Sequence, residues 1–242
     1  MSAIPRLYLD QPFAPGQTLP LSDAQANYLF AVLRLTQGAE VDVFNGRDGE
    51  WRATVAQAAK RAGVLRLEAP QAPQVAPPDL WLVFAPLKKA RTDMVVEKAV
   101  ELGAARLCPV LTDYTQGERI RPDKMAAHVI EAAEQCGATH VPGVDAPVKL
   151  AALLAGWDPA RALVWCDEGL ARLSALPGGR AFPAAPAAIL IGPEGGFSPA
   201  ERARLAALPF AHPIRLGPRI LRAETAALAA LALWQQAQGD WL

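Results

Sequence analysis

The segment from Ala69 to Pro78 limits the folds open to this chain, because it contains four prolines and no charged residue. Proline fixes its own φ angle and has no backbone N–H, so such a run forms an extended connector rather than a helix or a central strand. We therefore expect a linker at 70–78, one domain at 1–70 and a second domain at 79–242. The length of 242 residues is compatible with two small domains.

The first domain has the alternating pattern of β-strands. Strands are predicted at 40–44, 51–55 and 63–67. Asn45-Gly46 follows the first of them and has the composition of a tight turn. A helix is predicted from Ser22 to Leu33, with Ser22 or Asp23 as its N-cap. These elements predict a small β-barrel that carries one helix.

In the second domain, predicted strands and helices alternate along the chain. Strands are predicted at 80–85, 106–111, 163–166, 187–191 and 213–216. Helices are predicted at 92–102, 122–136, 199–208 and 224–238. Thr92 is the expected cap of the first helix, and Ser198 with Glu201 forms a capping box before the third. This alternation predicts an α/β domain with a parallel sheet.

Composition excludes several classes of protein. Lys+Arg and Asp+Glu number 24 each, so general attraction to nucleic acid is weak and any RNA contact must come from local clusters. The three cysteines lie far apart, as is typical of reduced thiols in the cytoplasm. The longest apolar run, 226–234, is shorter than the ~20 residues of a membrane span. Histidine spacing gives no sign of a metal site.

The strongest local signal for a ligand is a glycine-rich loop between a predicted strand and a predicted helix. Gly192, Gly195 and Gly196 follow Ile191, and Glu194 is the only charged residue among them. The loop lacks the lysine of a phosphate-binding loop and the spacing of a dinucleotide fingerprint. Such a loop suits a neutral or cationic ligand, such as an adenosine that bears a sulfonium. On pattern alone, an ordinary tight turn is equally compatible.

A second signal is the stretch from Leu216 to Thr225, where a strand again ends before a helix. Glu224 complements the positive end of the helix dipole, whereas Arg222 opposes it, which favours another use for Arg222. The helix that follows is apolar on every face over 226–234. A helix of this kind is buried either in the core or against a second subunit, and the pattern favours neither.

Six stretches, in order along the chain, resemble the RsmE family of 16S ribosomal RNA uridine-N3 methyltransferases, which belongs to the SPOUT superfamily. They are Ile4-Pro5-Arg6, Val32-Leu33-Arg34, Glu97 to Gly103, Glu131 to Gly137, Ile191 to Gly196 and Leu216 to Thr225. The resemblance implies a PUA-like β-barrel that binds RNA, followed by a SPOUT-type α/β domain with a trefoil knot.

The resemblance also implies the activity: transfer of a methyl group from S-adenosylmethionine to N3 of a uridine in small-subunit ribosomal RNA. Family members act as homodimers through the last helix, without a metal. The cofactor is expected to lie against Cys166, Ile191, Gly192, Glu194, Gly195, Gly196, Leu216, Gly217, Ile220 and Leu221. The RNA is expected to contact Arg6, Arg34, Lys88 and Arg91.

The catalytic residues follow from the chemistry of uridine. N3 is nucleophilic only after it loses its proton, and negative charge then spreads onto O2 and O4. The fixed donors of a guanidinium suit that charge, so Arg222 is the expected stabiliser. Glu224 or Glu194 is the expected proton acceptor.

The chain departs from the family at three positions, where Tyr28 replaces a usual histidine and Tyr114 and Ala138 stand near common arginines. These positions lie on the expected RNA side of the protein. Two other functions remain open: a related activity such as ribose 2′-O methylation, and a non-catalytic RNA-binding assembly factor.

Overall fold

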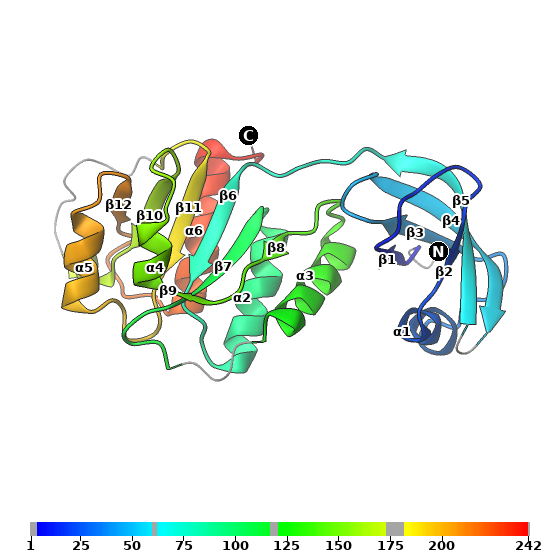
Figure 1. Cartoon of the computed structure of the whole chain (residues 1–242), viewed down its shortest axis with the longest axis horizontal. Helices are drawn as coiled ribbons and strands as arrows, with labels where there is room; N and C mark the ends of the chain where they lie inside the picture. The colour runs from blue at the N-terminus through cyan, green and yellow to red at the C-terminus, as the bar shows by residue number, and fades with distance from the viewer. Residues whose placement is uncertain (1–3, 60–61, 117–120, 173–181, 242) are drawn as a thin grey trace. The chain divides into compact units, whose positions relative to one another are not determined.

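A computed structural model of the protein describes residues 4–59, 62–116, 121–172 and 182–241 (Figure 1). The chain divides into two compact units. The first unit comprises Met1–Ala76 and Ala133–Val141, and the second comprises Pro77–Ala132 and Pro142–Leu242. The return of residues 133–141 to the first unit was not predicted from the sequence.

The first unit is built on a five-stranded sheet. Its strands are β1 (Arg6–Tyr8), β2 (Thr18–Pro20), β3 (Glu40–Phe44), β4 (Glu50–Ala59) and β5 (Ala62–Ala72), in the spatial order β1-β3-β4-β5-β2. Strand β5 continues through the first residues of the expected linker, and Pro70 lies opposite Trp51. The register between β4 and β5 shifts on both sides of this pair. A proline is tolerated there because the hydrogen-bond ladder is already interrupted.

One helical segment packs on this sheet. It begins as α1 (Asp23–Ala26) and continues as the wider π-helical turn η1 (Asn27–Val32). Ser22 is the N-cap, since its hydroxyl accepts from Gln25 N while Gln25 Oε1 accepts from Ser22 N at 2.9 Å. The predicted helix is therefore confirmed, with a widened second half. The core beneath it consists of aliphatic side chains from the strands and the helix, including Leu7, Leu9, Leu19, Leu29, Val41, Val43, Leu65 and Leu67.

Arg6 joins the returning segment 133–141 to the sheet of the first unit. Its guanidinium donates to three carbonyl oxygens at the end of helix α3 (Pro122–Cys136) and just beyond it: Ala133 O at 2.5 Å, Glu134 O at 3.0 Å and Ala138 O at 3.0 Å. Nε of Arg6 also pairs with Glu50 Oε2 at 2.6 Å. A cation at a helix C-terminus satisfies carbonyls that have no partner within the helix.

The second unit contains a parallel sheet, as the sequence predicted. Its strands are β6 (Leu80–Phe84), β7 (Arg106–Leu111), β8 (Gly143–Val144), β10 (Ala162–Cys166), β11 (Ala187–Ile191) and β12 (Ala211–Ile214), in the spatial order β12-β10-β11-β6-β7-β8 (Figure 1). Strand β9 (Val148–Lys149) also pairs with β7. The strand expected at 213–216 forms two residues earlier, because Cys166 on β10 is in register with Ile214. Arg215 and Leu216 thereby leave the sheet and begin the next loop.

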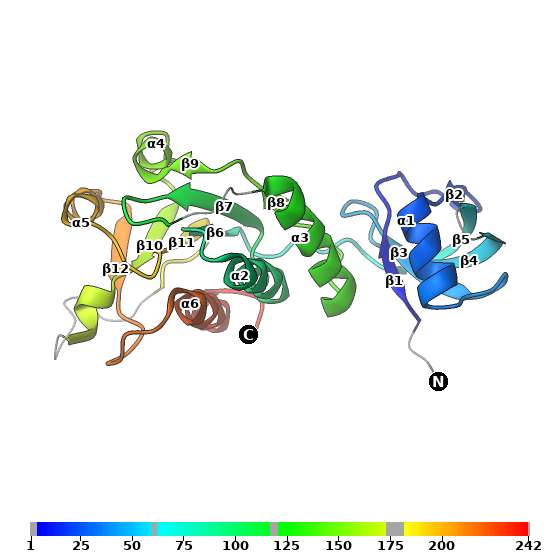
Figure 2. The same cartoon turned by 90° about the horizontal axis from the view of Figure 1, so that it is seen from below.

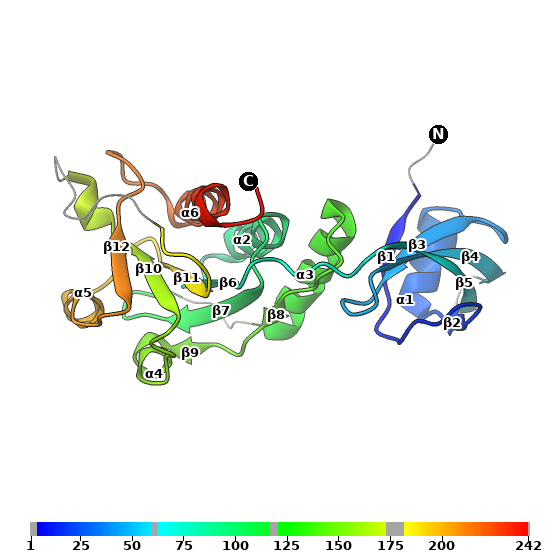
Figure 3. The same ribbon diagram turned by 90° about the horizontal axis from the view of Figure 1, so that it is seen from above.

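Helices cover both faces of this sheet. Helices α2 (Lys89–Glu101) and α6 (Ala223–Gln238) lie on one face, and α4 (Leu150–Ala155) and α5 (Pro199–Ala206) lie on the other (Figures 2 and 3). The capping box of Ser198 and Glu201 at the start of α5 is confirmed. Thr92 is not the cap of α2, which begins at Lys89. The Thr92 hydroxyl instead accepts from Leu87 N at 2.8 Å and donates to Leu87 O at 3.0 Å.

Helix α6 has an inner and an outer face, although its sequence is apolar all round. Ala227, Leu231 and Trp234 are fully buried within the chain. Gln235 is also fully buried, and its Nε2 donates to Leu102 O at 2.8 Å at the end of α2. On the outer face, Leu233 keeps 42% of its surface exposed. The helix therefore completes the core and still presents an uncovered apolar side chain.

No helix among the described residues has the length and apolar character needed to cross a bilayer.

We expect Arg6→Met to destabilise the first unit, because it leaves Glu50 and three carbonyl oxygens without their donor. Loss of a mostly buried guanidinium that donates four hydrogen bonds costs on the order of 2–4 kcal/mol. Arg34→Met is the matched control, since Arg34 is exposed. Hydrogen exchange of β1, β3 and residues 133–141, read by mass spectrometry, measures the effect. Equal exchange in the two variants would contradict this role of Arg6.

Candidate functional site

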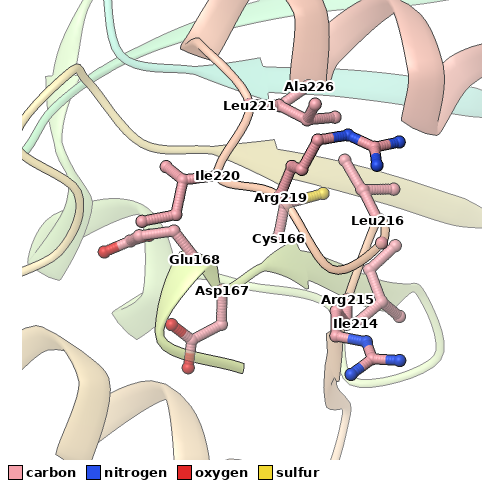
Figure 4. A pocket seen from close by; sticks show the side chains of 11 residues that line it. Cys166, Asp167, Glu168, Ile214, Arg215, Leu216, Arg219, Ile220, Leu221 and Ala226 are labelled. Carbon is pink, nitrogen blue, oxygen red and sulfur yellow. The ribbon is translucent and has the colours of Figure 1, made fainter. Parts of the chain in front are cut away.

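A hollow lies beyond the carboxyl ends of β10 and β12, the edge where ligands bind in open parallel sheets. The hollow is open to solvent, and Figure 4 shows the side chains of its lining residues. Its lining comes from two segments and the start of α6: Cys166, Asp167, Glu168, Ile214, Arg215, Leu216, Gly217, Arg219, Ile220, Leu221 and Ala226. The expected cofactor residues Cys166, Leu216, Gly217, Ile220 and Leu221 are thus brought together.

The inner surface of the hollow is largely apolar. Ile214, Leu221 and Ala226 contribute aliphatic carbon, and Cys166 contributes a thiol. Burial raises the pKa of Cys166 to about 12, so the thiol stays neutral and is a poor nucleophile near pH 7. The charged residues among its lining are Asp167, Glu168, Arg215 and Arg219. An apolar hollow with a few polar groups suits a flat heteroaromatic ring with polar substituents.

The glycine-rich loop adjoins the hollow but does not line it. A Cβ at Gly196, whose φ is +67°, would overlap Glu168 Oε1. A Cβ at Gly195 would lie 3.2 Å from the Cβ of Tyr114, on the loop after β7. The glycines therefore permit close packing against both neighbouring segments. The expected cofactor residues Ile191, Gly192, Glu194, Gly195 and Gly196 are not among those that line the hollow.

Arg91 connects the two loops that the sequence singled out. Strand β10 separates β11 from β12, so these loops do not follow adjacent strands. Helix α6 nevertheless packs against β11, and Arg91 lies between two carboxylates. Its Nη1 is 3.3 Å from Glu194 Oε1, and its Nε is 3.6 Å from Glu224 Oε1. A residue expected to contact RNA therefore pairs with both expected proton acceptors.

The two carboxylates differ in their surroundings. Glu194 is exposed, whereas the Glu224 side chain keeps only 9% of its surface. Oε2 of Glu224 is buried without a hydrogen-bond partner among the described residues. A buried oxygen in this state carries a desolvation cost of about 1–3 kcal/mol. Arg222 is exposed at the N-cap of α6 and makes no side-chain cap bond there.

The other expected RNA residues differ in how free they are to bind. Arg34 and Lys88 are exposed, and Arg34 has a left-handed φ of +58°. Arg6 uses its donors within the first unit, as described above. At the positions that depart from the family, Tyr28 packs on the core of the first unit, and Ala138 supplies a carbonyl to Arg6.

Sequence reasoning placed the segment after Trp165 at this site but missed the ion pairs that hold it. Arg202, on α5, pairs with Asp167 and Glu168, both of which line the hollow. No motif contains these residues, and 34 and 35 positions separate the partners. Among the described residues, no group of three or more His, Cys, Asp or Glu side chains is placed to hold a metal ion.

Comparison with protein families matches both parts of the chain. Residues 74–235 match the family described as RNA methyltransferase domain, and residues 21–68 match the RNA methyltransferase PUA domain. The chain belongs to the RNA methyltransferase family. The family expected from the sequence motifs is confirmed.

Similar proteins carry a more specific name. Ribosomal RNA small subunit methyltransferase E of Rickettsia conorii is 28% identical over 234 residues, covering 94% of this chain and 93% of that protein. The protein of the same name from Synechocystis is 33% identical over 220 residues, covering 89% of this chain and 72% of the relative.

Solved structures resemble the whole chain. Ribosomal RNA small subunit methyltransferase E from Neisseria gonorrhoeae, bound to S-adenosyl methionine, has a TM-score of 0.86 at 26% identity, with 99% of this chain and 100% of that chain covered. A protein from Legionella pneumophila, solved with the bound cofactor SAM, has a TM-score of 0.86 at 31% identity, with 98% and 99% covered. The expected fold class, a SPOUT-type α/β domain after a PUA-like domain, is confirmed.

Proposed function

We propose that this protein transfers a methyl group from S-adenosylmethionine to N3 of a uridine in small-subunit ribosomal RNA. The observation that carries the proposal is the apolar hollow at the carboxyl ends of β10 and β12, in a chain of the RNA methyltransferase family. Relatives over the whole chain are named for small-subunit ribosomal RNA, and two similar structures contain S-adenosylmethionine.

The residues present fit the cofactor. The aliphatic surface of Ile214, Leu221 and Ala226 suits the two faces of an adenine ring, and Cys166 adds no charge at neutral pH. Backbone groups of the segments after β10 and β12 supply donors and acceptors for the ring edge and the ribose. Bound S-adenosylmethionine supplies an electrophilic methyl group on its sulfonium.

The position of Arg222 next to the hollow supports a role for it at the uracil. Its neighbour Leu221 lines the hollow, and Arg222 itself is exposed at the start of α6. We propose that its guanidinium stabilises the charge that develops on O2 and O4 when N3 loses its proton. Glu224, with its buried unpaired oxygen, or Glu194, which is exposed, accepts that proton.

The substrate needs a binding surface beyond the reacting base. We propose that exposed Arg34 and Lys88 contact RNA phosphates. Arg91 contributes to the RNA site indirectly, because it pairs with Glu194 and Glu224 and holds these two carboxylates in place. The uridine must be unstacked before its N3 reaches the methyl group. We further propose that the protein works in the cytoplasm as a homodimer through the outer face of α6, where Leu233 is exposed.

Nucleoside mass spectrometry tests the reaction. Purified protein, S-adenosylmethionine and small ribosomal subunits from a strain that lacks the gene should yield 3-methyluridine. A 2′-O-methylated nucleoside would instead support ribose methylation. Cofactor binding without any methylated product would refute the proposed uridine reaction, and a protein that binds the RNA but not the cofactor would match an assembly factor.

Arg222→Lys separates chemistry from binding. The variant keeps a positive charge but loses the planar set of donors, so the single-turnover rate should fall by ~10²-fold or more at saturating cofactor and RNA. Cofactor affinity should change little. Raising the pH should restore part of the rate, because more N3 anion then forms without help. A wild-type rate in the variant, or loss of cofactor binding alone, would remove Arg222 from this role.

Leu233→Glu tests the homodimer. A glutamate at this position would place an unpaired charge in the interface, so sedimentation velocity should show monomers. Ala206→Glu, an exposed position on α5, adds the same charge on the opposite face of the sheet and should leave the dimer intact. Leu231 is unsuitable for this test, because it is fully buried within one chain. A monomeric wild-type protein would refute the proposal.

A further inference from the structure

Arg202 contacts two segments that meet at the hollow. Its guanidinium pairs with Asp167 Oδ1 and with Glu168 Oε1, both on the segment after β10. Its Nε donates to the carbonyl oxygen of Phe197 at 3.3 Å, directly after the glycine-rich loop. One side chain of α5 therefore joins both segments.

The pair of Arg202 with Asp167 is better shielded from water than a surface ion pair. The exposed fractions of the side chains are 9% for Asp167, 29% for Arg202 and 35% for Glu168. Oδ1 of Asp167 also accepts from Gly169 N at 2.9 Å, in the short 3-10 helix η2 (Glu168–Arg172) that follows. Charge-assisted bonds with little exposure hold their partners more firmly than fully solvated pairs do. The Asp167 side chain is thus fixed from two directions.

The carboxylates of Asp167 and Glu168 lie on the outer side of the segment that lines the hollow. In Figure 4 the carboxylates of Asp167 and Glu168 point away from Leu221 and Ala226, which lie across the hollow. The two acids therefore meet Arg202 behind the wall of the hollow, and the backbone of 166–168 forms part of that wall. Without a cation between them, two neighbouring carboxylates repel each other.

Gly196 gives an independent sign of how tightly this region is packed. A Cβ at this position would overlap Glu168 Oε1, the atom that Arg202 holds. A free glutamate could swing away from such a Cβ, whereas a paired one must break its ion pair to do so. The position of Glu168 therefore also constrains the glycine-rich loop.

We propose that Arg202 is a positioning residue for the cofactor: it holds Asp167 and Glu168 from behind, so that residues 166–168 form a fixed wall of the hollow and the glycine-rich loop is held against the outside of that wall. The inference rests on the proposed function, because it takes S-adenosylmethionine as the occupant of the hollow. Arg202 touches neither the cofactor nor the RNA in this scheme, and it acts only through the two acids and the Phe197 carbonyl.

Calorimetry on the full-length protein, with S-adenosylmethionine and S-adenosylhomocysteine as probes, tests the proposal. Arg202→Met keeps the alkyl chain and removes the contacts, and it should raise both dissociation constants by about tenfold. Arg204→Met removes the same charge from an exposed position on the same helix and should leave both constants unchanged. In turnover, KM for the cofactor should rise in Arg202→Met while kcat and KM for RNA stay near wild type.

A second variant keeps the test valid if Arg202→Met does not fold. Arg202→Lys keeps the charge, but a single ammonium cannot reach Asp167, Glu168 and the Phe197 carbonyl together, so its dissociation constants should rise by about threefold. Adding Glu168→Gln to Arg202→Met should cost less than the sum of the two single changes, since both break the same pair.

The outcomes separate this inference from the proposed function. Wild-type affinity in a folded Arg202→Met protein, or in Arg202→Lys if the methionine variant does not fold, overturns the role of Arg202. A wild-type protein that binds neither probe overturns the proposed function itself.

Discussion

Strand β10 hydrogen-bonds in parallel to β11 on one side and to β12 on the other, and this pairing decides where the site forms. Parallel strands bring their carboxyl ends to one edge, so the segments after all three strands emerge together. The register between β10 and β12 decides which residues line the hollow. Cys166 lies opposite Ile214, and the residues that follow each of them leave the sheet and line the hollow. A shift of this register would move the lining of the hollow out of line with the start of α6.

The arginines explain how a chain with no net charge still organises a charged site. Arg6, Arg91 and Arg202 each bridge segments that lie far apart in the sequence, and each does so through carboxylates or carbonyl oxygens. In the second unit, Arg91 connects the glycine-rich loop to the start of α6, and Arg202 connects it to the segment after β10. Positive charge is thus used to hold loops in place, whereas Arg34 and Lys88, the proposed RNA contacts, are exposed.

Local sequence patterns predicted most of the elements, because strands such as β6 and β11 are continuous apolar runs and α5 carries its own capping box. Errors arose where distant partners decide the outcome. Pairing with β10, for example, moved β12 two residues towards the N-terminus. The error at Thr92 is local, because its hydroxyl bonds to the backbone of Leu87, five positions earlier, and does not cap the helix. The hollow could be placed from strand ends and motifs, but Arg202 could not, since its partners lie more than 30 positions away. The trefoil knot implied by the family resemblance stays a prediction.

Helix α3 begins in one compact unit and ends in the other, where Arg6 binds its last carbonyl oxygens. The first unit is therefore not a continuous stretch of chain: it is assembled from the N-terminus and from residues 133–141. Cutting the chain at the proline-rich connector would leave the first unit incomplete, because its residues 133–141 would stay attached to the second unit. A gene fragment that ends at this connector lacks a piece of the first unit that it encodes. Recombination between relatives can then exchange the two units cleanly only when both stretches of the first unit come from the same parent.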